Sequence, residues 1–83
     1  DRATIERVVA ADPAVDAIVQ LMTLQRGPRC IMVLMDVDFA DQLDTADIER
    51  TVARLRADIQ AAVPAARDIY LSARRRPDTV NPA

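Results

Sequence analysis

The sequence predicts a small α+β domain in which two helices cover one face of a three-stranded mixed sheet. Its 83 residues provide chain for one hydrophobic core. Apolar residues follow helical spacing in two segments and alternate in three others, in the order helix, strand, strand, helix, strand. A short link makes the first two strands antiparallel, whereas a helix between the second and third predicts a right-handed parallel crossover. Hydrophobic residues make up 51% of the chain, which excludes a disordered protein.

The first predicted element is a short helix over residues 2–11. Asp1 suits the N-cap or the positive end of the helix dipole. Asp12 precedes Pro13, and this position disfavours helix, so the helix should end there. The apolar stripe of this helix consists of Ile5, Val8 and Val9.

Val15–Gln25 and Cys30–Phe39 read as two strands because β-branched residues are dense in both. The five-residue link between them contains Gly27, and we expect this glycine to adopt the positive φ of a hairpin turn. The better core face is the odd-numbered set: Val15, Ala17, Val19, Leu21, Ile31, Val33, Met35, Val37 and Phe39. The other face is apolar near the hairpin and polar at its far end.

The clearest helix spans Asp44–Val63, with Asp44 as the N-cap and Asp47 completing a capping box. Pro64 ends it. Its apolar stripe consists of Ile48, Val52, Leu55, Ile59 and Ala62/Val63. Its outer side carries Glu49, Arg50, Arg54 and Asp58.

A third strand is predicted at Arg67–Ala73, with Ile69, Leu71 and Ala73 facing inward. We therefore divide the chain into a folded domain, residues 1–73, and a tail, residues 74–83. The tail lacks an apolar period, and we expect it to be mobile.

The composition excludes several functions. The chain has no His, one Cys and one Gly, which leaves no Ser-His-Asp or Cys-His catalysis, no usual zinc site and no glycine-rich phosphate loop. The net charge of −2 argues against nucleic acid as a partner. No segment is long and apolar enough to span a bilayer. We predict no enzyme, and no catalytic, cofactor-binding or metal-binding residue.

Three carboxylates nevertheless share one end of the second strand face. If Leu24 pairs with Cys30, then Asp16 lies opposite Asp38, beside Asp36. Opposed carboxylates repel unless something neutralises them. Three alternatives would relieve this repulsion. The carboxylates could bind a hard cation such as Mn²⁺ or Mg²⁺, contact arginines of a partner, or be solvated at the strand end.

Two further groups of residues could form a binding site, but each has a simpler structural interpretation. The sulfurs of Met22, Cys30 and Met32 could suit Cu⁺, but an apolar patch explains them better. The Arg74–Arg76 run could attract anionic lipid, although a solvated tail is the simpler interpretation.

The face opposite the helices is half apolar, and a lone soluble domain rarely leaves such a face exposed. The sequence therefore predicts a homodimer in which a second copy covers it.

Short motifs along the chain resemble the C-terminal domain of cation diffusion facilitator transporters. They are the strand entry Asp12–Val15, the hairpin Leu24–Pro28, the strand end Met35–Phe39, the helix start Leu43–Asp44, the helix end Val63–Pro64 and the last strand Ile69–Leu71. The resemblance covers about residues 2–73.

The resemblance implies a metallochaperone-like, or ferredoxin-like, αββαβ fold. It further implies a cytoplasmic dimerisation and regulatory domain of a transporter that moves divalent cations such as Zn²⁺, Fe²⁺ or Mn²⁺ out of the cytoplasm, generally in exchange for protons. The membrane domain of the same polypeptide, placed in the cell inner membrane, would precede Asp1.

The chain departs from the family at its usual regulatory metal site. The positions where other members carry His or Asp ligands fall near Asp36, Ser72 and Arg74 in this sequence. Arg cannot ligate a cation, so the resemblance implies a member whose regulatory His site is missing and which binds divalent metal weakly at most. The alternative is a free-standing ferredoxin-like small-ligand sensor, similar to ACT-type domains.

Overall fold

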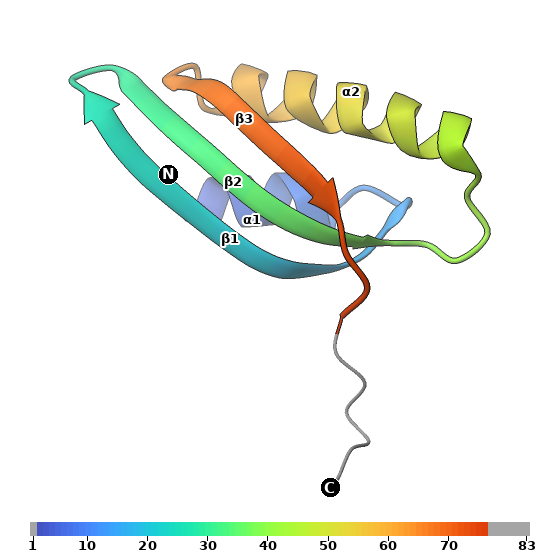
Figure 1. The fold of residues 1–83 in the computed structure, drawn as a ribbon. Helices are drawn as coiled ribbons and strands as arrows, with labels where there is room; N and C mark the ends of the chain where they lie inside the picture. The colour runs from blue at the N-terminus through green and yellow to red at the C-terminus, as the bar shows by residue number, and fades with distance from the viewer. Residues whose placement is uncertain (1, 77–83) are drawn as a thin grey trace, which may run out of the picture.

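The computed structural model describes residues 2–76 and has the predicted element order. The elements are α1 (Arg2–Ala10), β1 (Val15–Gly27), β2 (Cys30–Phe39), α2 (Thr45–Ala62) and β3 (Ala66–Ala73). Figure 1 shows the three strands as one layer with both helices behind it. The N-cap predicted at Asp1 lies outside the described residues. No described helix is long and apolar enough to cross a membrane.

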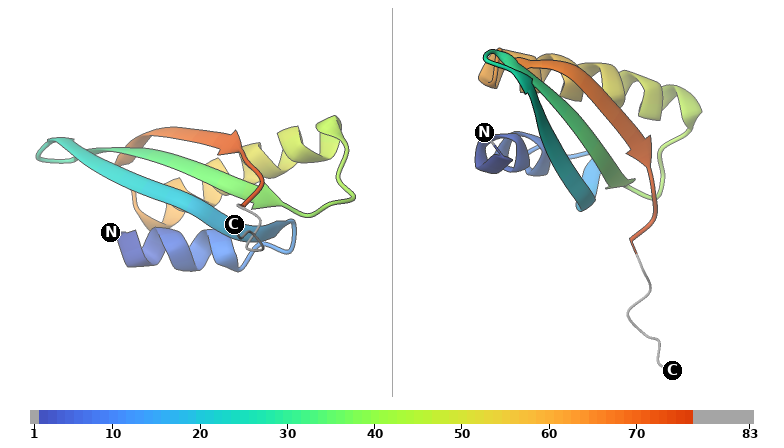
Figure 2. Two further views of the ribbon diagram at one scale, coloured as in Figure 1. Left: turned by 60° about the horizontal axis from the view of Figure 1, so that its bottom comes forward. Right: turned by 60° about the vertical axis from the view of Figure 1, so that its left-hand side comes forward.

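The sheet has the order β1-β2-β3, with β2 in the centre. β1 pairs with β2 antiparallel, and β3 pairs with β2 in parallel, as the hairpin and the helical connection predict. Both helices pack on one side of the sheet, and the turned views in Figure 2 show no helix or strand of residues 2–76 on its other side. The predicted α+β, αββαβ architecture is therefore confirmed.

The core lies between the sheet and the two helices. Leu55 and Ile59 of α2 are fully buried against it, as the helical stripe predicts. The buried hydrophobic residues are Ile5, Val9, Leu21, Val33, Met35, Val37, Phe39, Leu55, Ile59, Val63, Ala66 and Ile69. Ala73 shares the helix-facing side with its register partner Val37, as predicted, but it lies at the strand end and is exposed.

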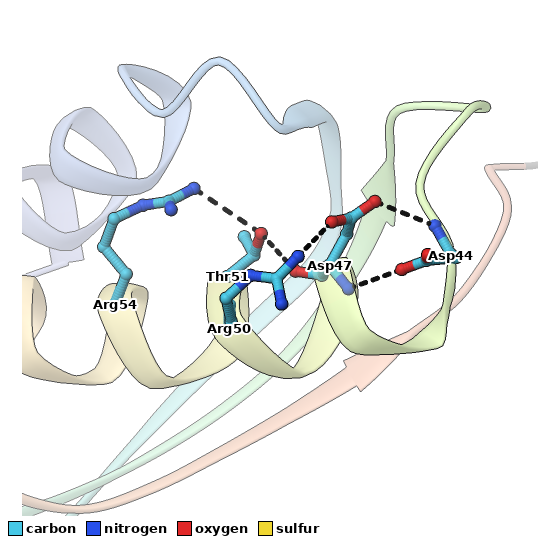
Figure 3. Close-up of polar contacts among 5 residues, drawn as sticks. All are labelled: Asp44, Asp47, Arg50, Thr51 and Arg54. Atoms are coloured by element: carbon cyan, nitrogen blue, oxygen red, sulfur yellow. Dashed lines mark hydrogen bonds and ion pairs between the residues drawn. The ribbon is translucent and has the colours of Figure 1, made fainter.

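The predicted capping box opens α2 (Figure 3). The Asp47 N–H donates to Asp44 Oδ1 at 2.8 Å, and the Asp44 N–H donates to Asp47 Oδ2 at 3.2 Å. The backbone hydrogen bond from Asp44 holds the pKa of the Asp47 carboxyl below its usual range. One turn later the Thr51 hydroxyl donates to the Asp47 carbonyl at 2.8 Å.

The hairpin differs from the prediction in its register. Leu24 pairs with Met32, and Cys30 pairs with Gly27, so the predicted pairing of Leu24 with Cys30 is wrong. Gly27 does not adopt a positive φ. The turn therefore lies closer to Cys30 in the sequence than predicted, and β1 extends to Gly27.

Irregularities in β1 also change which of its residues face the helices. The register shifts between Val15 and Ala17 and again between Ile18 and Gln20. Such bulges displace the alternation of side chains by one residue. As a result the even-numbered residue Ile18 packs against the core. The prediction had placed only odd-numbered residues of this strand on the core face.

Candidate functional site: the open face of the sheet

We call the side of the sheet opposite the helices the open face. Its side chains form rows across the three strands, because paired residues point the same way. Near the hairpin these rows are apolar, and farther along they become polar. The rows are Leu24, Met32 and Asp68; Met22, Leu34 and Tyr70; and Gln20, Asp36 and Ser72.

The hairpin half of the open face is exposed and apolar. Met22 and Tyr70 are each more than half exposed, at 51% and 55%, and Leu34 lies between them at 38%. Leu24 is 52% exposed in the neighbouring row. Adjacent exposed hydrophobic side chains of this size are typical of an interaction surface.

The other half of the open face carries the three carboxylates singled out in the sequence, and arginines of the same chain neutralise them. Arg74 Nη1 lies 3.0 Å from Asp36 Oδ2. Arg76 Nε lies 3.2 Å from Asp38 Oδ2, and its Nη2 lies 4.0 Å from Asp16 Oδ2. The neutralising charge thus comes from within the chain.

The carboxylates do not face each other as predicted. Asp38 pairs with Ala17, and Asp36 pairs with Gln20. Among residues 2–76, no group of three or more His, Cys, Asp or Glu side chains is placed to hold a metal ion. The prediction that the chain has no metal-binding residues of its own stays a prediction.

The positions that the family resemblance marked as metal ligands do come together. Asp36 and Ser72 are register partners on β2 and β3, and Arg74 forms its ion pair with that same Asp36. A guanidinium therefore stands beside the carboxylate that would serve as the ligand.

The three sulfur-bearing residues do not converge in one row. Met22 lies opposite Leu34, Met32 opposite Leu24, and Cys30 opposite Gly27. Cys30 is a partly buried free thiol. The arrangement suits apolar packing better than coordination of a soft metal.

A further ion pair, which the sequence did not predict, joins the α1–β1 connection to α2. Arg54 of α2 donates from Nε and Nη2 to the two carboxylate oxygens of Asp12, each at 2.8 Å. Asp12 also accepts from the Ala14 N–H at 3.0 Å. The hydrogen bond from Arg54 holds the pKa of the Asp12 carboxyl below its usual range, although burial acts in the opposite direction.

This pair has no local sequence signal, because its members lie 42 residues apart. Asp12 was interpreted as the residue before a helix-ending proline and as the start of a strand-entry motif, and Arg54 as part of the outer side of α2. The pair is structural, because it ties the α1–β1 connection to α2 on the side away from the open face.

Comparison with solved structures places the fold. A zinc form of a MamM C-terminal-domain variant superposes with a TM-score of 0.82 at 17% sequence identity, covering 99% of this chain and 90% of that one. A nickel form of another variant gives 0.81 at 14% identity, covering 92% and 95%, respectively. A manganese form gives 0.80 at 15% identity, covering 90% and 94%. The chain has the fold of the MamM C-terminal domain.

The MamM neighbours are C-terminal domains of a cation diffusion facilitator. The fold implied by the resemblance to that family is therefore confirmed over nearly the whole chain. Neither the family models nor the curated proteins compared with the sequence gave a match. The likeness to MamM lies in the three-dimensional arrangement, since few residues are shared.

Proposed function

We propose that this chain is the cytoplasmic C-terminal regulatory domain of a cation diffusion facilitator that exports a divalent cation of the Zn²⁺, Fe²⁺ or Mn²⁺ class in exchange for protons. The observation that carries the proposal is the full-length match to MamM C-terminal domains at TM-scores of about 0.8. The short motifs quoted from the sequence support it independently, because they fall at the same turns and helix ends that define the fold.

We propose further that the domain acts as a homodimer in which a second copy covers the hairpin half of the open face. Met22, Leu34 and Tyr70 form a continuous exposed row across all three strands there. Burying such side chains between two copies is favourable by about 25 cal/mol per Å² of apolar surface. A twofold axis would place each row against its own copy.

Because the sequence has no His, the proposed dimerisation and regulatory domain would lack the usual histidine metal site. The Arg74–Asp36 pair supports this assignment, because a cation already neutralises the candidate ligand. Divalent metal would then bind to the isolated domain weakly or not at all. The domain would belong to an integral protein of the cell inner membrane and face the cytoplasm.

The decisive test is the coding sequence that precedes Asp1 together with transport by the complete protein. We expect about six hydrophobic spans of roughly 20 residues each upstream. Proteoliposomes containing the complete protein should take up or release a divalent cation in response to a proton gradient. A gene without such spans would contradict the transporter and favour the small-ligand sensor. Transport that is unchanged when residues 1–83 are deleted would contradict the regulatory role.

A further inference from the structure

After β3 the chain continues past the end of β2. The Arg74 N–H donates to the carbonyl of Val37 on β2 at 2.8 Å, and the Arg76 N–H donates to Asp38 Oδ2 at 3.3 Å. Figure 1 shows the red segment after β3 passing the end of β2. The Arg74 bond extends the β2–β3 pairing by one residue, and the Arg76 bond holds the following segment at the polar end of the open face.

The side chains of this segment make ion pairs with two different strands. Arg74 reaches Asp36 on β2, whereas Arg76 bridges Asp38 on β2 and Asp16 on β1. Asp38 is only 8% exposed. A carboxylate that loses most of its water is stable as an anion only when hydrogen bonds and opposite charge replace that water.

We propose that residues 74–76 form an arginine strap, which holds the C-terminal segment across the sheet and supplies the positive charge required by Asp16, Asp36 and Asp38. The guanidinium groups of the chain thereby take the place of the cation that three neighbouring carboxylates would otherwise bind from solution. All the contacts lie within one chain, so the strap does not depend on dimerisation or on transport.

Arg75 provides a matched control within the strap. It carries the same charge and is exposed like its neighbours. Within residues 2–76, neither its guanidinium nor its amide has an ion pair or hydrogen bond to another residue. Replacing Arg75 removes the same net charge as replacing Arg76 but leaves the strap contacts in place.

The first measurement is amide hydrogen exchange by NMR on the 83-residue chain, residue by residue. Amides held in hydrogen bonds exchange more slowly than free ones. We expect the Arg74 and Arg76 amides to exchange at least about tenfold more slowly than the Arg75 amide, and the Arg76 protection to fall as salt screens the ion pairs. Equal exchange at the three positions would overturn the proposal.

The second measurement uses Mn²⁺ as a probe of unneutralised carboxylates, through paramagnetic broadening of the Asp36 and Asp38 amides. Arg76→Gln should increase this broadening about twofold or more over Arg75→Gln, because local negative charge concentrates cations. Asp38→Ala is a second variant, which removes the oxygen that accepts from the Arg76 N–H and should abolish Arg76 protection. Equal broadening in the two arginine variants, or an Arg76 amide still protected in Asp38→Ala, would contradict the strap.

Discussion

Arg54 donates two hydrogen bonds of 2.8 Å, one to each carboxylate oxygen of Asp12, although the two residues lie 42 positions apart. The Asp12 side chain is 4% exposed, whereas that of Arg54 is 48% exposed. The fork geometry is the strongest arrangement available to an arginine and a carboxylate. The pair therefore fixes the connection between α1 and β1 against the outer side of α2.

Asp12→Asn should destabilise the protein at neutral pH by about 1–2 kcal/mol, because Arg54 loses its charged partner and the buried site loses a charge-assisted bond. Chemical denaturation followed by circular dichroism measures this loss. Asp41→Asn is the control, since Asp41 is an exposed carboxylate in the β2–α2 loop. An equal effect of the two substitutions would contradict the role assigned to the Asp12–Arg54 pair.

The same pair predicts a pH dependence. The folded-state pKa of Asp12 lies below its ordinary value of 3.8, so the unfolded state binds the proton more readily. The stabilisation is therefore fully present above the unfolded pKa and is lost as the pH falls through the folded pKa. The stability difference between the native protein and Asp12→Asn should shrink on acidification from about pH 6 to about pH 2. A difference that stays constant over this range would contradict the assignment.

Leu55→Ala should destabilise the protein by about 2–5 kcal/mol, because Leu55 is fully buried between α2 and the sheet. The free energy of unfolding from urea titration measures the effect. Gln60→Ala is the control, because it removes side-chain atoms on the exposed side of α2 without leaving a cavity. Ala53→Gly is not a suitable control, since it changes helix propensity. A loss below about 1 kcal/mol at Leu55 would mean that the helix packs differently.

Dimerisation predicts a mass of two chains by light scattering at high micromolar concentration. Met22→Glu and Tyr70→Glu each place a charge beside Leu34 in the apolar row and should shift the protein to a monomer. Gln60→Glu adds the same charge on exposed α2 and should leave the dimer intact. A monomeric native chain, or variants as dimeric as the native chain, would refute the proposed interface.

Zinc should bind to the isolated domain weakly or not at all. The sequence has no His, and guanidinium groups neutralise the candidate carboxylates. Isothermal calorimetry with Zn²⁺ should therefore show no submicromolar site. Such a site would contradict this expectation, and its loss in Asp36→Asn and Asp38→Asn would locate it at the carboxylates.

Local sequence patterns predicted the elements and their order well. The ends of β2 and the N-cap of α2 at Asp44 agree with the structure, because alternation, helical spacing and capping are properties of neighbouring residues. The antiparallel pairing of β1 with β2 was predicted correctly, but its register was wrong. Its register depends on the turn and on the bulges near Ala17 and Val19, and neither leaves a clear mark in the sequence.

The candidate site was predicted only in part. The sequence placed Asp16, Asp36 and Asp38 at one end of the sheet, and they do lie there beside positive charge. The source of that charge, Arg74 and Arg76, was assigned to a mobile tail because it follows the last apolar period. Mobility of 74–83 stays a prediction; residues 77–83 lie outside the described range, whereas Arg74 and Arg76 contact the sheet.

The bulges of β1 have a consequence for how molecules meet at high concentration. β1 is an edge strand of 13 residues, and a flat edge of that length would offer its free peptide groups to strands of neighbouring molecules. The register shifts between Val15 and Ala17 and between Ile18 and Gln20 interrupt the regular spacing of those groups. Strand-by-strand growth into aggregates is thereby discouraged along this edge of the sheet.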